Sequence, residues 1–456
     1  MSVSVIILAA GQGKRMRSQL PKVLHKLAGQ PLLSHIVTKV RQLTPKQIII
    51  VYGHGGALVS NAIKADDITW VQQKEQLGTG HAVLQALPYL QDNTTTLILV
   101  GDVPLINTVT LRELLSTTTN NPLGLITANL DNPTGLGRII RNSTGSISAI
   151  VEEADANSDQ LKIKEINTGI IAIQTKHLKK VLPHVKNYNA QKEYYLTDIV
   201  SHTINGGDTI ATVLAADPIE VIGINDRKQL SYLERAYQIR EADRLMEQGV
   251  SFCDPNRFDL RGTIKIGQDV YIDANVILEG EITLGDNVII GPNCYIRDTY
   301  ISSGVQIFAN CVIEEAIIDS QSKIGPFARI RPESKLGKQV HIGNFVEIKK
   351  SNIADRSKIN HLSYIGDTLI GKNVNVGAGT ITCNYDGVNK YQTIIEDNVF
   401  IGSDTQLIAP VTIGAGATIG AGTTITKDAP PDKLTLSRVP QKTHLTWKRS
   451  IKNPNK

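Results

Sequence analysis

The stretch IKIGQDVYIDANVILEGEITLGDNVIIGPNCYI (Ile264–Ile296) repeats one pattern every six residues. An aliphatic residue recurs at that spacing without exception, and the spacing resumes after short interruptions until Ile425. Glycine follows many of these aliphatic residues. A six-residue aliphatic repeat kept over such a length is typical of the hexapeptide repeat of a parallel β-helix. In the quoted stretch the repeating residues are Ile266, Ile272, Leu278, Leu284, Ile290 and Ile296.

Three such hexads predict a triangular coil of about 18 residues. We expect the aliphatic residue to fill the inside of the coil, and the glycine after it to permit the tight turn at each vertex. The interruptions of the spacing are one-residue deletions, with one exception between Thr382 and Ile395. There the polar run NYDGVN (Asn384–Asn389) breaks the repeat, so this run is expected to protrude.

The first half of the chain has an α/β pattern instead. Short apolar runs rich in β-branched residues alternate with stretches of helical period. Because each run is apolar on successive residues, we expect parallel strands that are covered on both faces. A polar or glycine-rich turn follows each strand at its carboxyl end, where open parallel sheets bind ligands. The runs with their turns are Val3–Leu8 with AAGQGKR (9–15), Ile48–Tyr52 with GHGG (53–56) and Leu97–Val100 with GDVP (101–104).

A long helical pattern joins the two halves. Asp226 and Gln229 form a candidate capping box at its start, and Gly249 is a candidate stop, so one helix is expected over Asp226–Val250. The predicted organisation is an α/β domain (1–227), a linker helix (228–250), a β-helix (251–437) and a basic tail (438–456).

The composition excludes several classes of protein. With 48 basic and 43 acidic residues the net charge is +5, which is too small to indicate nucleic-acid binding. The four cysteines have no CxxC spacing, so neither a zinc ribbon nor a disulfide scaffold is indicated. No apolar run has the length of a membrane helix, and the basic residues of VSVIILAAGQGKR follow its apolar run, the reverse of a signal peptide. We therefore expect a cytoplasmic protein without membrane insertion or nucleic-acid binding.

The loop LAAGQGKRM (Leu8–Met16) has the composition of a phosphate-binding loop. Its backbone N–H groups can surround a phosphate chain, and its two cations add positive charge. Lys22 follows closely, QLGTGHA (Gln76–Ala82) supplies a second glycine-rich turn, and Asp102 stands at the end of a strand. From the residues alone two other interpretations stay open: a glycine turn that merely leads into a helix, and Asp102 as a helix N-cap.

Further motifs of the first half resemble those of sugar-1-phosphate nucleotidyltransferases. They are DNPTGLGRI (131–139), VEEADA (151–156), EINTGI (165–170) and GIND (223–226). Together with the hexapeptide half and its NYDG insertion, the chain resembles, over residues 5–440, a bacterial family of bifunctional N-acetylglucosamine-1-phosphate uridylyltransferases and glucosamine-1-phosphate N-acetyltransferases. The fold class that the resemblance implies is a Rossmann-like α/β nucleotidyltransferase domain followed by a left-handed parallel β-helix. It also implies a homotrimer.

The resemblance implies two reactions in series. Glucosamine-1-phosphate is acetylated by acetyl-CoA, and N-acetylglucosamine-1-phosphate then reacts with UTP to give UDP-N-acetylglucosamine, a precursor of the cell wall and lipopolysaccharide. For the second reaction it implies Mg²⁺ at Asp102 and Asn225, and phosphate binding by Arg15 and Lys22. The other residues that it places around UDP-N-acetylglucosamine are Leu8, Ala9, Ala10, Gly11, Gln73, Gly78, Thr79, Val100, Gly101, Gly137, Glu152 and Asn167.

Two positions depart from the family pattern. Val100 stands where an aromatic residue commonly precedes Gly-Asp, and Lys14 stands where the loop usually has Thr. Neither change removes a metal ligand or a phosphate-binding cation. The chemistry also needs no general base, because a sugar phosphate is already an anionic nucleophile and the barrier is charge repulsion at the α-phosphate.

For acetyl transfer the resemblance makes His361 the general base, since an imidazole suits deprotonation of an attacking amine near neutral pH. An exposed histidine is usually inert, so the residue type alone does not establish this role. The resemblance assigns the sugar phosphate to Arg331, Lys349, Tyr364 and Asn375. It assigns acetyl-CoA to Ala378, Asn384, Tyr385, Ser403, Ala421 and Arg438.

Three alternative interpretations exist. The β-helix would be a non-catalytic oligomerisation domain of a single nucleotidyltransferase, or the whole chain would be a scaffold that tolerates loss of Asp102 or His361. A zinc site of the kind that some β-helix hydratases carry needs three histidines, whereas only His341 and His361 precede His444 in the tail. The tail's cations are either CoA-phosphate ligands or solvated residues.

Overall fold

The computed structural model describes residues 2–11, 13–53, 55–63 and 65–449. The chain forms two compact units, Met1–Tyr237 and Gln238–Lys456. The division falls inside one helix, α7 (Arg227–Glu247), and each unit is described by itself below.

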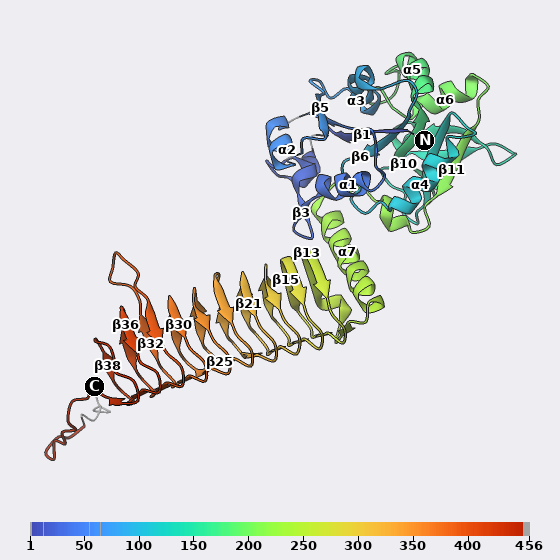
Figure 1. Cartoon of the computed structure of the whole chain (residues 1–456). Coiled ribbons are helices and arrows are strands. Elements are labelled where there is room, and N and C mark those ends of the chain that lie inside the picture. Colours follow the sequence, from blue (N-terminus) through green and yellow to red (C-terminus); the bar gives the residue numbers. More distant parts are fainter. Residues whose placement is uncertain (1, 12, 54, 64, 450–456) are drawn as a thin grey trace, which may run out of the picture. The chain divides into compact units, whose positions relative to one another are not determined.

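The first unit is built on a mixed sheet with the strand order β11-β7-β10-β6-β1-β4-β5 (Figure 1). β1 pairs in parallel with both β4 and β6, which confirms the prediction for the three apolar runs. β10 is antiparallel to β6 and β7, and the hairpin β8–β9 continues from it. The strands are β1 (Val3–Ala9), β4 (Gln47–Tyr52), β5 (Ile68–Gln72), β6 (Thr95–Val100), β7 (Leu123–Asn129), β8 (Arg138–Arg141), β9 (Ile147–Val151), β10 (Glu165–Gln174) and β11 (Ile210–Leu214), with a small β2–β3 hairpin at Lys26–Leu27 and Gln30–Pro31.

Helices cover both faces of this sheet, so its central strands are apolar on successive residues. In β1, Ile6 packs into one hydrophobic cluster and Ile7 into the cluster on the other face, and neither side chain is exposed. The helices of this unit are α1 (Leu32–Arg41), α2 (Gly56–Ala62), α3 (Thr79–Ala86), α4 (Thr108–Thr117), α5 (Thr175–Val181) and α6 (Asp198–Asn205).

The carboxyl ends of β1 and β6 lie directly against each other. The backbone N–H of Gly101 donates to the carbonyl oxygen of Leu8 at 2.8 Å. A Cβ atom at Gly101 would stand only 2.9 Å from that oxygen. The glycine therefore lets the turn that carries Asp102 approach the loop that follows β1.

The start and end of α7 follow the expected signals. Asp226 Oδ1 accepts from the backbone N–H of Gln229 at 2.9 Å, and Gln229 Oε1 accepts from the N–H of Asn225 at 2.7 Å. Gly249, with φ of 95°, follows the last turn. The helix buries Leu233 in a core cluster of the first unit and Leu245 in that of the second.

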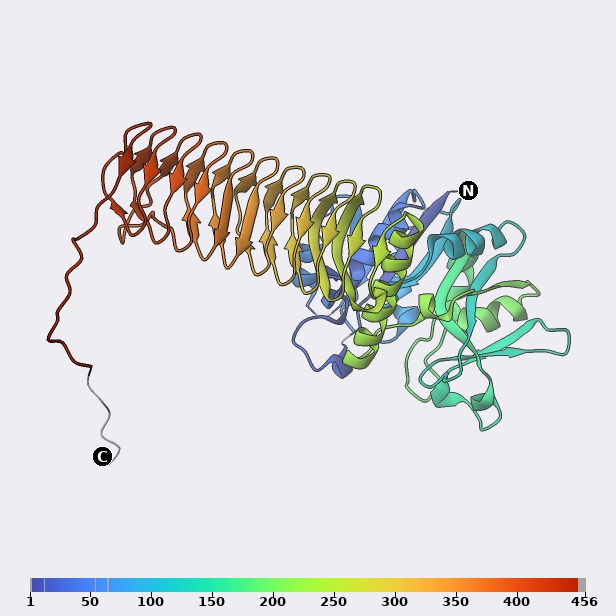
Figure 2. The ribbon, with the colours of Figure 1, turned by 90° about the horizontal axis from the view of Figure 1, so that it is seen from below.

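The second unit is a parallel β-helix of hexapeptide repeats, and Figure 2 shows its coils stacked one on the next. The strand register gives the length of each coil. Phe258 pairs with Val276, three full hexads further on, whereas Tyr295 pairs with Val312, one residue short of three hexads. This confirms coils of three hexads with one-residue deletions.

Each coil contributes short strands to three faces of the prism. One face has the order β12-β14-β16-β19-β22-β25-β28-β31-β34-β37-β39, and the other strands form the two remaining faces. The strands are β12 (Ser251–Phe252), β13 (Phe258–Ile266), β14 (Tyr271–Ile272), β15 (Val276–Leu284), β16 (Ile289–Ile290), β17 (Tyr295–Arg297), β18 (Tyr300–Ile301), β19 (Gln306–Ile307), β20 (Val312–Glu314), β21 (Ala316–Ile318), β22 (Lys323–Ile324), β23 (Arg329–Ile330), β24 (Ser334–Leu336), β25 (His341–Asn344), β26 (Glu347–Lys349), β27 (Asn352–Ile353), β28 (Lys358–His361), β29 (Tyr364–Gly366), β30 (Thr368–Ile370), β31 (Asn375–Val376), β32 (Ile381–Cys383), β33 (Thr393–Ile395), β34 (Phe400–Ile401), β35 (Gln406–Ile408), β36 (Val411–Ile413), β37 (Thr418–Ile419), β38 (Thr424–Ile425) and β39 (Leu434–Thr435).

The prediction for the repeat glycines was wrong in its physical reason. Turns are made by left-handed residues that stand three positions after the aliphatic one, such as Asn275 (φ 59°) and Asn293 (φ 60°). The glycine directly after the aliphatic residue is needed because the next coil passes close by. A Cβ at Gly343, for example, would stand 1.9 Å from the carbonyl oxygen of Asn360.

Candidate functional site

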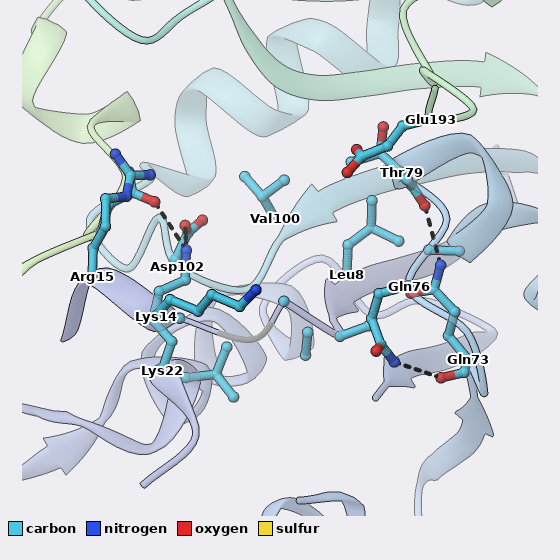
Figure 3. Close-up of a pocket in the computed structure, with 18 residues that line it drawn as sticks. Leu8, Lys14, Arg15, Lys22, Gln73, Gln76, Thr79, Val100, Asp102 and Glu193 are labelled. Carbon is cyan, nitrogen blue, oxygen red and sulfur yellow. Dashed lines mark hydrogen bonds and ion pairs between the residues drawn. The ribbon is translucent and has the colours of Figure 1, made fainter. Parts of the chain in front are cut away.

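A cavity of about 560 Å³ opens at the carboxyl ends of β1 and β6 (Figure 3). It is the place that the strand-end turns predict. Most residues that the resemblance assigns to the nucleotide, its phosphates and its metal line this cavity: Leu8, Ala9, Ala10, Gly11, Arg15, Lys22, Gln73, Gly78, Thr79, Val100, Asp102 and Asn225.

Lys22 joins the two predicted metal ligands inside the cavity. Its ammonium group is ion-paired with the carboxylate of Asp102 and donates to Asn225 Oδ1 at 3.1 Å. The two oxygens therefore converge on one point that a cation already occupies. Carboxylate and amide oxygens are the donors that Mg²⁺ takes in proteins, so these residues fit the metal.

The loop after β1 packs closely on Lys22. Gly13 has φ of 61°, and a Cβ atom there would stand 2.7 Å from the Cβ of Lys22. Lys14 and Arg15 follow in a short 3₁₀ turn, where both are exposed and line the cavity. The departure at Lys14 thus adds a third cation to this wall.

The opposite wall is formed by the turn before α3. Gln73 is only 3% exposed, and its Nε2 donates to the carbonyl oxygen of Gly78 at 3.1 Å. Gln76 Nε2 donates to the backbone oxygen of Gln73 at 3.0 Å (Figure 3). Gln76 and Glu193 also line the cavity, although neither was predicted as a site residue. Gln76 opens the QLGTGHA motif and could have been found, whereas Glu193 follows no motif.

A second cavity of about 190 Å³ shares Leu8, Thr79 and Val100 with the first. It contains the residues that the resemblance assigns to the sugar, namely Gly137, Glu152 and Asn167. The two cavities share this wall, so a nucleotide and a sugar are assigned to neighbouring parts of one site. Gly101 lines neither cavity and contacts Leu8 through the backbone hydrogen bond described above.

Glu152 is the titratable group of the sugar side. Burial raises the pKa of its carboxyl group, and a hydrogen bond from Thr197 opposes that rise. Thr197 Oγ1 donates to Glu152 Oε1 at 3.1 Å. The Glu152 carboxylate is thereby oriented in a partly dry cavity, which suits a hydrogen-bond acceptor for sugar hydroxyl groups.

On the β-helix, a second polar cluster lies along one corner of successive coils. Arg331 Nη1 lies 2.8 Å from Glu347 Oε1, and Lys349 Nζ lies 3.2 Å from Asp367 Oδ2. The side-chain amide of Asn384 donates to the same carboxylate of Asp367. Asp367 was missed as a site residue; it directly follows Gly366, which pairs with Lys349 in a coil one residue short of three hexads.

His361 lies at the next corner, at the start of the face that contains β29. It pairs in register with Asn344 of the preceding coil. Its Nδ1 is 3.0 Å from Asn344 Oδ1, and the ring is exposed. Asn344 opens the polar run NFVEIKK (344–350) but was not selected as a site residue; the coil register places it beside His361.

The predicted acetyl-CoA residues fall on two corners. Ala378, Ser403, Ala421 and Arg438 follow β31, β34, β37 and β39, so they form a stacked edge that begins one coil after His361. Asn384 and Tyr385 belong to the other corner with Lys349. Tyr364 lies on the face between the two corners, and Asn375 opens β31. Within one chain these residues are therefore not all brought together.

The tail up to Arg449 is exposed, and Lys452 and Lys456 lie outside the described residues. No group of three or more His, Cys, Asp or Glu side chains suited to a metal ion occurs among the described residues. Of the helices described, none is both long and apolar enough to cross a bilayer.

Comparison with known proteins matches different families to the two halves of the chain. The profile of the MobA-like NTP transferase domain matches residues 5–153, that of the GMPPB C-terminal domain matches 260–344 and 318–395, and that of the bacterial transferase hexapeptide matches 392–427. The bifunctional protein GlmU of Nitrosococcus oceani is 64% identical over 99% of this chain and 100% of its own length.

The chain belongs to the GlmU family. The GlmU protein of Methylococcus capsulatus is 56% identical over 99% of this chain and 98% of its own length, and that of Cupriavidus pinatubonensis is 52% identical over 99% of both. The resemblance seen in the sequence is thus confirmed. The chain is a bifunctional enzyme, a uridylyltransferase and glucosamine-1-phosphate N-acetyltransferase that produces UDP-N-acetylglucosamine. The predicted fold class is confirmed with it.

Proposed function

We propose that uridylyl transfer takes place in the cavity at the ends of β1 and β6, with Asp102 and Asn225 as the ligands of Mg²⁺. The convergence of both side-chain oxygens on the Lys22 ammonium carries this proposal. A bound Mg²⁺ would neutralise phosphate charge and polarise the α-phosphate of UTP. Arg15 and Lys22 bind the phosphates, which lowers the repulsion that the anionic sugar phosphate meets and favours departure of pyrophosphate.

The two adjoining cavities orient the reactants. Leu8–Gly11, Gln73, Gly78 and Thr79 hold the nucleotide in the larger cavity. In the smaller one, Glu152 accepts hydrogen bonds from the sugar, and Gly137 and Asn167 lie beside it. The backbone N–H of Asn167 donates to the carbonyl oxygen of Gly137 at 2.9 Å, so these two sugar-binding residues are held together. The phosphate of the sugar then lies next to the α-phosphate of UTP, where the two cavities adjoin at Leu8, Thr79 and Val100.

Acetyl transfer takes place on the β-helix, with His361 as general base. A neutral imidazole that donates from Nδ1 to Asn344 Oδ1 keeps a lone pair on Nε2. That lone pair accepts the proton of the sugar amine as it attacks the thioester of acetyl-CoA. Arg331, Lys349, Tyr364 and Asn375 bind the sugar phosphate, while Ala378, Asn384, Tyr385, Ser403, Ala421 and Arg438 bind acetyl-CoA.

The enzyme works as a homotrimer in the cytoplasm in this proposal. The predicted acetyl-CoA residues lie on two corners of one chain, and a neighbouring copy completes a site between them. Apolar side chains exposed on one face of the β-helix supply a packing surface: Tyr300, Ile317, Leu369 and Ile394. All four cysteines are free thiols, as in a reducing compartment.

Metal binding tests the first site directly. We expect Asp102→Ala and Asn225→Ala each to weaken Mn²⁺ binding, followed by electron paramagnetic resonance, by about tenfold or more. Pyrophosphate release should fall in parallel. Asp92→Ala is the matched control, because Asp92 is an exposed aspartate of the same unit that pairs with Lys179. An Asp102→Ala protein that binds Mn²⁺ like the wild type would overturn the assignment.

A further inference from the structure

Two sequence motifs of the first unit meet beside the smaller cavity. DNPTGLGRI (131–139) forms a loop and the start of β8, and VEEADA (151–156) begins at the end of β9. Residues 131–137 are called the sugar-side loop below, because residues 135–137 line the cavity that is assigned to the sugar. Each motif also contains a charged residue to which the proposed function gives no role.

These charged residues are Arg138 and Glu153, and they form an ion pair. Arg138 opens β8 and is only 2% exposed. Its Nη2 lies 3.3 Å from Glu153 Oε2. Because an unpaired buried guanidinium is costly, burial of Arg138 requires a carboxylate beside it. The ion pair therefore ties the two motifs together.

The same pair also holds the backbone of the sugar-side loop. Glu153 Oε2 accepts from the backbone N–H of Gly135, and Arg138 Nη1 donates to the carbonyl oxygen of Leu136. Two consecutive residues of the cavity wall are thus hydrogen-bonded to β8 and to the turn after β9 through one ion pair. Such charge-assisted hydrogen bonds are stronger than those between neutral groups.

The held loop lies close to the carboxylate that is proposed to bind the sugar. A Cβ atom at Gly137 would stand 3.1 Å from Glu152 Oε2. A displacement of the loop would therefore change the width of the cavity at Glu152. The two neighbouring glutamates have different contacts: Glu152 lines the cavity, and Glu153 holds the wall opposite to it.

We infer that Arg138 and Glu153 are positioning residues for the sugar. Their ion pair holds the sugar-side loop close to Glu152, so the cavity has its shape before the sugar arrives. A wall that is fixed in advance loses no conformational freedom on binding, which lowers KM for N-acetylglucosamine-1-phosphate. This role rests on the proposed binding of the sugar in the smaller cavity.

A double substitution tests this role. Arg138→Met together with Glu153→Met removes both backbone hydrogen bonds of the loop and leaves no unpaired charge, an exchange that is often neutral for stability. We expect KM for N-acetylglucosamine-1-phosphate, followed by pyrophosphate release, to rise about tenfold or more. KM for UTP, and kcat at saturating sugar phosphate, should stay within about threefold of the wild type.

Two single substitutions separate this role from general destabilisation. Glu153→Gln keeps a full-length acceptor for the N–H of Gly135, so KM for the sugar phosphate should stay within about threefold of the wild type. Glu165→Ala is the matched control, because Glu165 pairs with Arg141 of the same strand at 2.6 Å and lines neither cavity. It should leave KM for the sugar phosphate unchanged.

If the double variant does not fold, Glu153→Asp replaces it. The shorter side chain keeps the charge but cannot reach both of its partners, so KM for the sugar phosphate should rise more than in Glu153→Gln. A folded double variant with the wild-type KM for the sugar phosphate, or equal rises in KM for both substrates, overturns the inference and leaves the proposed site intact. If Glu152→Gln itself has the wild-type KM for the sugar phosphate, the assignment of the sugar to this cavity is wrong.

Discussion

Gly13 shows how a single position controls the phosphate loop. It has φ of 61°, and a Cβ there would stand 2.7 Å from the Cβ of Lys22. We expect Gly13→Ala to displace Lys22 and to lower kcat/KM for pyrophosphate release by about tenfold or more, because a catalytic cation moves and the backbone is strained. Acetyl transfer should be unchanged.

The matched control for this substitution is Gly145→Ala. Gly145 also has a left-handed φ, of 81°, but nothing lies within 4 Å of the place that a Cβ would take. Both variants therefore carry backbone strain, and only Gly13→Ala disturbs Lys22. Equal losses of activity in the two variants would refute the role given to the Gly13–Lys22 contact.

The raised pKa of Glu152 predicts that KM for the sugar phosphate depends on pH. Burial raises the pKa of its carboxyl group, so lowering the pH should protonate it earlier than an ordinary glutamate and raise KM for N-acetylglucosamine-1-phosphate. The Glu152→Gln enzyme should have a high KM for N-acetylglucosamine-1-phosphate at every pH, without the rise at low pH (the acid limb of the profile). Thr197→Val removes a hydrogen bond that favours the charged form, so the acid limb should move to higher pH.

The same shift has a consequence for stability. A carboxyl group whose pKa is raised by folding disfavours the folded state once the pH exceeds its unfolded value, and this cost is absent below about pH 4. Glu152→Gln should therefore raise Tm at neutral pH and leave it unchanged in acid. If the difference in Tm between Glu152→Gln and the wild type grows as the pH falls, the raised pKa of Glu152 is not what changes the stability.

Among single residues, the strand-end turns made most of the first site predictable. Lys22, Asp102 and the loop after β1 were found because chemistry-bearing residues follow buried strands. Glu193 was not found, because it reaches the cavity from a segment without a motif. The hydrogen bonds of Gln73 to Gly78 and His81 depend on side-chain orientation, which a residue pattern does not contain.

Among the elements, the excursion after β32 interrupts the coil register most clearly and can be removed separately from the β-helix. Thr368 pairs with Thr393, well beyond three hexads, whereas the next coil pairs Thr393 with Val411, three full hexads on. The N–H of Tyr391 donates to the carbonyl oxygen of Asn384 at 2.9 Å, so the excursion closes at its base. The predicted protrusion is confirmed for Tyr385–Asn389, which lie in the exposed run 385–392, whereas Asn384 at its base is buried.

Removing residues 385–391 should restore a coil of three hexads and leave the β-helix folded. We expect thiol release from acetyl-CoA to fall about a hundredfold or more, because Tyr385 and the neighbouring cation Lys390 are lost, while pyrophosphate release continues. A Gly/Ser replacement of the same length separates loop chemistry from loop length. A deletion variant that still releases thiol would show that the excursion takes no part in acetyl transfer.

The coils also show how far an element can be predicted from its repeat. The six-residue repeat predicted the coil length and the buried aliphatic positions, because an aliphatic residue of every hexad must fill the interior of the coil. The role of the glycines did not follow, because it depends on the distance between neighbouring coils. Gly343 approaches Asn360 across that distance, and no spacing within one coil reveals the contact.

For the whole molecule, the two patterns of the sequence were enough to establish two units and the family. The corner of the β-helix on which each site residue lies was not predicted. Ala378 and Ser403 lie on one corner, where the excursion separates them by more than a coil of three hexads, and Lys349 and Asn384 lie on another, where both contact Asp367. The placement of His361 beside Asn344 follows from the coil register.

This GlmU-family chain is proposed to have two catalytic sites that work independently, one on each unit. The decisive experiment follows pyrophosphate release and thiol release separately in Asp102→Ala and His361→Ala, and in a mixture of the two proteins. We predict that Asp102→Ala loses only pyrophosphate release and that His361→Ala loses only thiol release. The mixture, given glucosamine-1-phosphate, acetyl-CoA and UTP, should form UDP-N-acetylglucosamine. Loss of both activities in either folded variant, or a mixture that forms no product, would show that the two sites are not independent.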